Sequence, residues 1–214
     1  MTTATKQLTN DFSKIVTGRR SIKNYDPSVK ISHEEMTEIL SLATLAPSSV
    51  NMQPWRFLVI ESAEAKAKLA PLARFNQTQV ETSSAVIAVF GDLDNFDNAE
   101  EIYGSAVEKG FMPLEIKEQL LNSFTGYYEN ISREEMKDVV LVDAGLVSMQ
   151  LMLAARSFGY DTNPIGGYDK DKIAETFGLD KDRYVPVMLI SIGKAQDAGR
   201  PSVRLSIDKV AQWL

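Results

Sequence analysis

The stretch 132-SREEMKDVVLVDAGLVSMQLMLAARSFG-159 predicts the longest helix of the chain. Ser132 and Glu135 have the spacing of a capping box, in which the serine hydroxyl bonds the amide three residues on and the acid reaches back. From Arg133 to Phe158, apolar residues occupy most sides of the helix, which is typical of a helix in a core or an oligomer interface. Gly159 is the expected C-terminal stop, because glycine tolerates the left-handed conformation found there.

Three runs of apolar and β-branched residues predict buried strands: WRFLVI at 55–60, AVIAVFG at 85–91 and VPVMLISI at 185–192. Shorter helices are predicted at 11–17, from a second capping box at Ser32 and Glu35 up to Pro47, at 63–72 and at 169–177. Residues 160–167 are expected to form a loop. Because helices separate the few strands, an all-β protein is excluded. No strand is followed by the G-x-G-x-x-G turn of a doubly wound dinucleotide-binding domain.

The sequence contains no repeat, low-complexity tract or Pro/Gly/Ser-rich linker, so a single domain over 1–214 is expected. The polar segment at about 92–130 has the least regular pattern. Its aromatic residues, among them Phe124, Tyr127 and Tyr128, would suit a mobile flap or a helical excursion. They could stack on a substrate, or they could only pack the excursion.

Composition excludes several kinds of site. The chain has a formal net charge of -6, no cysteine and one histidine, His33, which lies in the capping box at 32–35 and is expected to be a surface residue. Disulfides, thiolate metal sites, cysteine nucleophiles and multi-histidine metal sites are therefore excluded, and a redox reaction would need a cofactor. No metal is expected.

The bulk properties also bear on partners and location. An acidic chain is a poor candidate for nucleic-acid binding, which needs a positive field. The first ten residues lack the apolar run of a signal peptide, and the apolar stretches fall short of the roughly 20 residues that span a bilayer. We therefore expect a cytoplasmic protein that binds neither nucleic acid nor membrane.

Two polar segments in the first quarter of the chain are candidates for ligand binding. Arg19, Arg20, Ser21 and Lys23 combine three cations with a hydroxyl, which suits a phosphate or an electron-rich ring edge. The alternative is a solvated basic turn. The run PSSVNMQPW at 47–55 offers neutral hydrogen-bonding side chains between two prolines, which suits a ligand rich in hydroxyls and carbonyls. The alternative is an ordinary helix-to-strand connection.

Two later segments extend the set. In NPIGG at 163–167 the adjacent glycines would let the backbone approach a flat ligand closely, although a simple turn has the same pattern. Lys194, Arg200 and Arg204 follow the last predicted strand and could neutralise a phosphate. Basic residues near a C-terminus are more often solvated, so this signal is weak by itself.

Together the four segments resemble the FMN-dependent nitroreductase family, which has R-R-S-x-K, P-S-S-x-N-x-Q-P-W, P-x-G-G and a basic tail in this order. The match extends from about Asp11 to Val210. The resemblance implies an α+β fold with a central, mostly antiparallel sheet flanked by helices. It also implies an intertwined homodimer with the long helix at the interface, and a variable excursion at about 92–130 that covers the pocket.

The resemblance further implies which residues bind FMN. Arg19 would bind the phosphate, Arg20 and Ser21 would line the phosphate and ribityl end, and Lys23 would lie at the N1/O2 edge. The Gly166 amide would lie near N5, at a position where many members carry an acidic residue and others glycine. The same chain would add Asn76, Gln79, Pro164, Ile165, Gly167, Arg200 and Arg204. The neighbouring subunit would add Pro47, Ser48, Ser49, Asn51 and Gln53.

The implied reaction is ping-pong. NADH or NADPH would pass a hydride to flavin N5, and a small acceptor such as a nitroaromatic or a quinone would then use the same pocket. No side chain is expected to be catalytic, since the chemistry lies at N5 and is tuned by Lys23 and Gly166. Three alternatives remain open: a same-fold flavoenzyme with another reaction, such as dehalogenation or enone reduction; a flavin store or sensor without turnover; and an acidic interaction domain without a cofactor.

Overall fold

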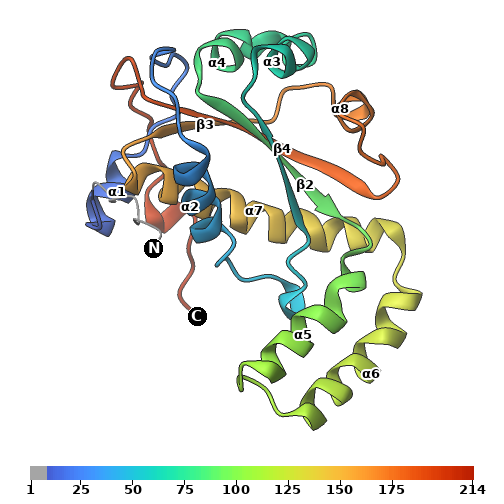
Figure 1. Cartoon of the computed structure of the whole chain (residues 1–214). Coiled ribbons are helices and arrows are strands. Elements are labelled where there is room, and N and C mark those ends of the chain that lie inside the picture. The colour runs from blue at the N-terminus through green and yellow to red at the C-terminus, as the bar shows by residue number, and fades with distance from the viewer. Residues whose placement is uncertain (1–8) are drawn as a thin grey trace.

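The computed structural model describes residues 9–214. Four strands form one antiparallel sheet in the order β1-β2-β4-β3 (Figure 1). Their bounds are Trp55–Ile60 for β1, Ala85–Asp92 for β2, Asp161–Ile165 for β3 and Tyr184–Gly193 for β4. Because helices lie on both faces of this sheet, the predicted α+β class with a central antiparallel sheet is confirmed.

The described part of the chain also forms eight α-helices. They are α1 (Phe12–Gly18), α2 (His33–Ala43), α3 (Ala63–Leu69), α4 (Gln77–Thr82), α5 (Ala99–Glu108), α6 (Leu114–Asn130), α7 (Arg133–Ser157) and α8 (Lys170–Thr176). Short 3-10 turns occupy 49–51, 74–76, 95–98 and 207–209.

Strand β2 is buried along its whole length because helices cover both faces of the sheet. Successive side chains of a strand point to opposite faces. Ile87 and Val89 accordingly pack in the core beneath α2 and α7, while Val86 and Ala88 pack in the core beneath α3, α4 and α8. The apolar run at 85–91 suits a central strand with two covered faces, which is why the sequence predicted all of β2 except its last residue, Asp92.

Helix α7 begins and ends as its sequence predicts. The Ser132 hydroxyl accepts a hydrogen bond from the Glu135 amide at 3.2 Å, and the Glu135 carboxylate accepts one from the Ser132 amide at 3.0 Å. Gly159 follows the helix with a φ of 82°. At α2 only the first half of the predicted capping box forms. Ser32 caps the Glu35 amide at 3.1 Å, whereas the Glu35 carboxylate accepts a hydrogen bond from the Tyr160 hydroxyl.

By length and composition alone, α7 could cross a membrane, and it is the one helix in the described residues that could. The expectation that the apolar stretches fall short of that length was wrong for this segment. In the fold, however, α7 is a core helix: Val140, Ala144, Val147 and Leu151 are fully buried, and the last three pack in the core beneath the sheet. That the chain binds no membrane stays a prediction.

The structure differs from the sequence-based expectation at β3, which lies where a loop was predicted. Asp161, Asn163 and Pro164 are residues typical of turns. They are tolerated here because β3 pairs along one side with β4 and is otherwise bridged only by Ser21, opposite Thr162. The helix predicted at 63–72 ends at Leu69, just before Pro71. The polar segment at 92–130 is largely helical and contains α5 and α6.

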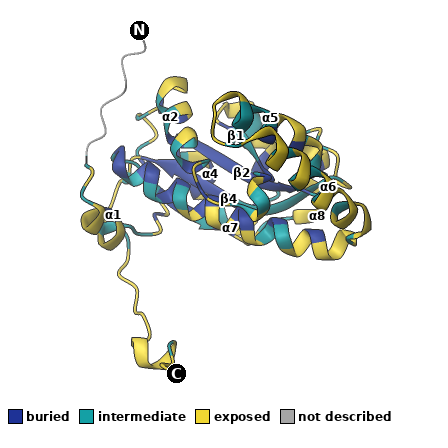
Figure 2. Cartoon of the chain, turned by 90° about the horizontal axis from the view of Figure 1, so that it is seen from below, coloured by how far each residue is buried: buried dark blue, intermediate teal, exposed yellow. Residues whose placement is uncertain are grey.

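The last fifteen residues extend away from the fold. From Arg200 to Leu214 every residue except Ala211 is exposed, and Figure 2 shows this tail projecting from the body. The exposed tail residues include large apolar side chains, among them Val203, Leu205, Ile207, Val210 and Trp213. Helix α7 exposes a second apolar surface, formed by Val142, Leu146 and Met149 on one face of the helix.

Candidate functional site

The basic segment that follows α1 lies along the outer edge of β3. The Ile22 amide donates a hydrogen bond to the Thr162 carbonyl at 3.1 Å, and Ser21 bridges to Thr162 in parallel orientation. The segment is extended here, so alternate side chains point to opposite sides. Ile22 is buried, whereas Ser21 and Lys23 are exposed and lie on the open side of the segment.

The chain beyond β4 returns alongside this basic segment. The Gln196 amide donates to the Asn24 carbonyl at 3.1 Å. Gly199 lies so close that an added Cβ would be 3.0 Å from Arg20 Cβ. Arg200 therefore follows directly after a residue packed against the basic segment, and its predicted role at a phosphate stays a prediction. Arg204 lies further along the exposed tail and donates to Ser202 and Val203 of its own segment.

A third group of predicted residues meets at the other end of β3. Asn76 Nδ2 donates to the Gly167 carbonyl at 3.3 Å, and Gln79 Nε2 donates to Asn76 Oδ1 at 3.0 Å. Pro164 and Ile165 belong to β3 itself, with the Ile165 side chain in the core beneath α8. Apart from Arg204, the residues predicted to bind FMN from the same chain thus lie along this short strand or near its two ends.

Gly166 and Gly167 are glycines that the chain itself does not require. Neither has a positive φ, and an added Cβ at either position would meet no atom within 4 Å. Both are exposed. Backbone conformation and internal packing, the usual reasons for glycine, are therefore absent here. A group that is not part of this chain and approaches the backbone closely would account for both residues.

The turn after α2 is strained. Val50, Asn51 and Gln53 have φ values of 43°, 61° and 48°, and such left-handed conformations cost a residue with a Cβ about 1–2 kcal/mol. The Ser48 hydroxyl accepts a hydrogen bond from the Gln53 amide at 2.9 Å and so closes the turn. Pro47, Ser49 and Asn51 are exposed, and Ser48 and Gln53 are partly exposed, so all five predicted residues reach the surface.

Two residues that the sequence analysis missed hold this turn from outside. Asp143 of α7 accepts a hydrogen bond from the Ser49 amide at 3.0 Å, and the Tyr103 hydroxyl of α5 donates to the Val50 carbonyl at 2.8 Å. Burial raises the pKa of Asp143, and the bond from Ser49 partly offsets this effect. Met52 is 1% exposed and packs with Tyr103 between α5 and the turn.

Within one chain, the strained turn is separated from the residues along β3. The turn contacts α7 at Asp143, whereas Gly18 lies next to Arg156 near the C-terminal end of α7. Asp143 and Arg156 are 13 positions apart, or about 20 Å at 1.5 Å per helical residue. Figure 1 shows the turn beside α5, below the middle of α7, and α1 at one end of α7. One chain therefore does not bring all the predicted residues together.

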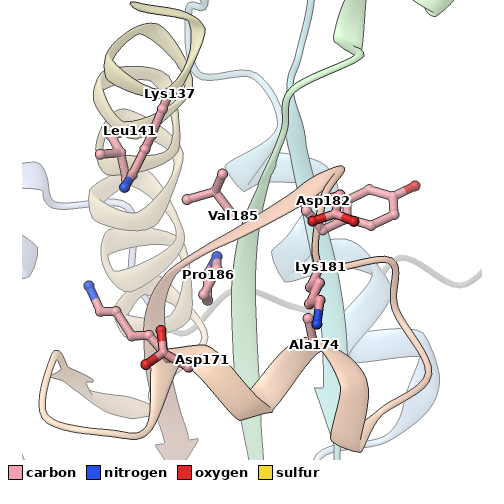
Figure 3. Close-up of a pocket in the computed structure, with 10 residues that line it drawn as sticks. Lys137, Leu141, Asp171, Ala174, Lys181, Asp182, Val185 and Pro186 are labelled. Carbon is pink, nitrogen blue, oxygen red and sulfur yellow. The ribbon is translucent and has the colours of Figure 1, made fainter. Parts of the chain in front are cut away.

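A cavity lies elsewhere in the fold. It measures about 510 Å³ and opens between α7, α8 and the start of β4, as Figure 3 shows. No residue predicted to bind FMN lines it. Its lysines, Lys137, Lys170 and Lys181, are largely balanced by Asp171 and Asp182. The cavity lies beside the part of β4 that extends beyond its pairing with β3.

Three aromatic residues of the excursion, Phe96, Tyr127 and Tyr128, contact one another. Tyr128 stacks on Phe96 with ring centroids 4.4 Å apart, and Tyr127 meets Tyr128 edge-on at 5.4 Å. Burial raises the pKa of Tyr128 to about 12. For Tyr128, packing within the excursion is therefore the observed role. His33 is the first residue of α2 and is exposed, as expected.

The nitroreductase family model matches residues 16–194. The chain belongs to the nitroreductase family. This member of the family is 67% identical, over 96% of its length and 98% of the relative, to YdgI of Bacillus subtilis, provisionally named an NAD(P)H nitroreductase. It is 39% identical, over 91% of each protein, to the CLA biosynthesis enone reductase of Lactiplantibacillus plantarum.

Solved structures agree with this assignment. A crystal structure from Exiguobacterium sibiricum, of a protein provisionally named a nitroreductase, was determined in complex with FMN. It is 67% identical to this chain, with a TM-score of 0.95, and the match covers 98% of this chain and 100% of the other. The family and fold expected from the four sequence segments are confirmed. The roles of the individual residues stay predictions.

Proposed function

We propose that the protein is an FMN-dependent NAD(P)H oxidoreductase. The observation that carries the proposal is the pair Gly166 and Gly167, which nothing in the chain itself requires, at the end of a strand whose start carries the basic segment Arg19–Lys23. A flat ring against the glycines and a phosphate against the arginines would use both features. Membership of the nitroreductase family and the FMN-containing relative support the same cofactor.

Different residues of this chain would bind different parts of FMN. Arg19, Arg20 and Arg200 would hold the phosphate, because guanidinium groups donate paired hydrogen bonds to its oxygens. Asn76 would offer an amide to the ring, oriented by Gln79. Lys23 would place a positive charge at the ring edge and stabilise the anionic reduced form. Ser21, Pro164, Ile165 and Arg204 would complete the contacts made by the same chain.

When bound, FMN would supply hydride transfer between a nicotinamide and a second substrate. We propose that the second substrate is a small acceptor such as a nitroaromatic or a quinone, which takes the place of the oxidised nicotinamide. NADH and NADPH are both candidate donors. The chain would supply position, charge and exclusion of water, and no side chain would form a covalent bond to a substrate.

We further propose that the active form is a homodimer in which Pro47, Ser48, Ser49, Asn51 and Gln53 of one chain complete the FMN site of the other. The separation of about 20 Å along α7 supports this arrangement. So do the apolar side chains exposed on α7 and on the tail, because patches of this kind usually mark an interface.

Light scattering tests the dimer directly. We expect a mass twice the 23.8 kDa of one chain. Leu146→Arg, which puts a charge into the exposed apolar face of α7, should shift the protein towards monomer. A wild-type mass of one chain would contradict the homodimer. A cytoplasmic location remains a further expectation, which cell fractionation would check.

Visible absorption spectroscopy tests the cofactor and the reaction. The purified protein should show flavin bands that bleach anaerobically with NADH or NADPH and return on addition of a nitroaromatic or a quinone. Bands that neither nicotinamide bleaches would favour a flavin store or sensor. A colourless protein that also fails to bind added FMN would contradict the proposal and favour an interaction domain.

Enone reduction is a second candidate, favoured by the relative named a CLA biosynthesis enone reductase. This reaction would use the same FMN site and donor and differ only in the acceptor. A comparison of kcat/KM for a conjugated enone, a nitroaromatic and a quinone would separate the two. A kcat/KM for the enone far above the other two would favour the second candidate.

A further inference from the structure

The turn at 48–53 carries backbone strain that its own hydrogen bonds do not explain. Three residues other than glycine, Val50, Asn51 and Gln53, have positive φ values. Within the turn, the Ser48 hydroxyl bonds the Gln53 amide, and Gln53 Nε2 donates weakly to Asn51 at 3.3 Å. Residues in sparsely populated conformations persist where the surroundings enforce them. The surroundings in this case are α5 and α7.

Asp143 and Tyr103 bond backbone groups of two successive residues of the turn, Ser49 and Val50. Asp143 accepts from the Ser49 amide at 3.0 Å, and Tyr103 donates to the Val50 carbonyl at 2.8 Å. Both side chains are 4% exposed. Both hydrogen bonds are partly buried. Hydrogen bonds that are partly shielded from water are stronger than fully exposed ones, and a backbone group that loses such a partner is costly to leave unpaired. The two contacts therefore favour the strained shape over relaxed alternatives.

A third contact joins the turn to the excursion. Met52 is almost fully buried in a small cluster with Ala99 and Tyr103, against which Phe96 and Tyr128 pack. The excursion is thus fixed to the turn by an apolar anchor as well as by the Tyr103 hydroxyl. The excursion at about 92–130, which is expected to cover the pocket, thus also supports the turn at 48–53, which is expected to form one wall of it.

We propose that Tyr103 and Asp143 are positioning residues for the FMN site. They hold the turn in the shape in which Ser49 and Asn51 reach the cofactor bound to the neighbouring chain. This inference rests on the proposed FMN-binding function. Without these bonds, only a fraction of the molecules keep the turn in the competent shape, and the apparent Kd for FMN rises by the inverse of that fraction.

The experiment compares wild type with Tyr103→Phe, Asp143→Ala and Asp143→Asn, with Tyr160→Phe as matched control. Tyr160→Phe also removes one hydroxyl hydrogen bond, made to Glu35 at 3.0 Å, but away from the turn. Two quantities are measured for each protein: hydrogen exchange of the amides at 48–53 without FMN, and Kd for FMN by fluorescence titration. Thermal unfolding is followed in parallel to identify any variant that does not fold.

Tyr103→Phe and Asp143→Ala should each speed exchange at 48–53 and raise the Kd by about 3- to 10-fold, the range expected for one lost hydrogen bond. Asp143→Asn keeps an oxygen that can accept from the Ser49 amide, so it should stay close to wild type, as should Tyr160→Phe. If the negative charge of Asp143 mattered rather than its hydrogen bond, Asp143→Asn would raise the Kd for FMN as Asp143→Ala does.

Two results would overturn the inference. If exchange or Kd in Tyr103→Phe and Asp143→Ala equals that of Tyr160→Phe, the two residues do not position the turn for FMN, although the proposed function stands. If wild type binds no FMN, the proposed function fails and the inference fails with it. The wild-type titration therefore tells the two failures apart.

Discussion

Replacing Gly199 by alanine tests how closely the returning C-terminal segment fits against the predicted phosphate-binding residues. Gly199 has a φ of 70°, which costs alanine about 1–2 kcal/mol. The added Cβ would lie 2.8 Å from Ile22 Cδ1 and 3.0 Å from Arg20 Cβ. Neither atom can move freely, since Ile22 is buried and a Cβ is fixed by the backbone. Overpacking of this kind adds about 1–3 kcal/mol, for a total of about 2–5 kcal/mol.

Gly178→Ala is the matched control, because Gly178 has a φ of 74° and an added Cβ would meet nothing within 4 Å. Urea unfolding and an FMN titration are run on both variants. Gly178→Ala should lower the free energy of unfolding by about 1–2 kcal/mol and leave the Kd unchanged. Gly199→Ala should lower the free energy of unfolding by about 2–5 kcal/mol, and any movement of the segment leading to Arg200 that relieves this strain should also weaken the Kd for FMN at least about tenfold, or about 1.4 kcal/mol. Equal effects of the two variants on both quantities would refute the reasoning.

Three further changes test other parts of the structure. In Gly91→Ala the new Cβ would lie 2.6 Å from Val140 Cγ2, so the free energy of unfolding should fall by about 1–3 kcal/mol. A double-mutant cycle with Val140→Ala should show coupling between the two positions, and additive effects would contradict this close fit of β2 to α7. Burial lowers the pKa of the Lys66 ammonium from 10.5 to about 8 in the folded protein. Between pH 10.5 and 8, the unfolded chain therefore binds a proton at Lys66 that the folded chain does not, so the free energy of unfolding falls as the pH drops through this range. Below pH 8 the whole of this loss of stability is present. The stability of Lys66→Met relative to wild type should therefore be about 1–2 kcal/mol higher at pH 7 than at pH 10.5, after allowance for solvent screening. Lys68→Met, at a lysine whose side chain is 55% exposed, is measured as the surface control. Lys23→Ala should lower the flavin reduction potential by about 30 mV or more, equivalent to about 1.4 kcal/mol, and slow reduction by nicotinamide while some FMN stays bound; an unchanged potential would mean that the lysine points elsewhere.

The elements that could be predicted from sequence are those whose local signals agree with their burial. β2 is apolar from Ala85 to Gly91 because both of its faces are covered, and the caps at Ser132 and Gly159 mark the ends of α7. β3 could not be predicted, because its turn-forming residues are tolerated only through pairing with β4, which is distant in sequence. α6 was foreseen only as one alternative, a helical excursion, since none of its residues is buried and no wide apolar face marks it.

In the candidate site, too, some residues could be predicted from local sequence and others could not. Its surface residues stand in short, ordered motifs, and these motifs also indicated the family. Tyr103 and Asp143 stand in no such motif, because their role depends on where α5 and α7 meet the turn at 48–53. One signal was present, however: Asp143 is the only charged residue between Asp138 and Arg156. A lone carboxylate in an apolar helix needs a partner, and here the partner is the Ser49 amide.

The distance along α7 between the turn at 48–53 and the basic segment has a genetic consequence in the proposed dimer. A chain defective only at Arg19 still offers an intact turn, and a chain defective only at Asn51 still offers an intact basic segment. When both alleles are expressed in one cell, mixed dimers hold one site with both defects and one site with neither. Two inactive alleles should therefore complement each other, with activity restored at one site of each mixed dimer.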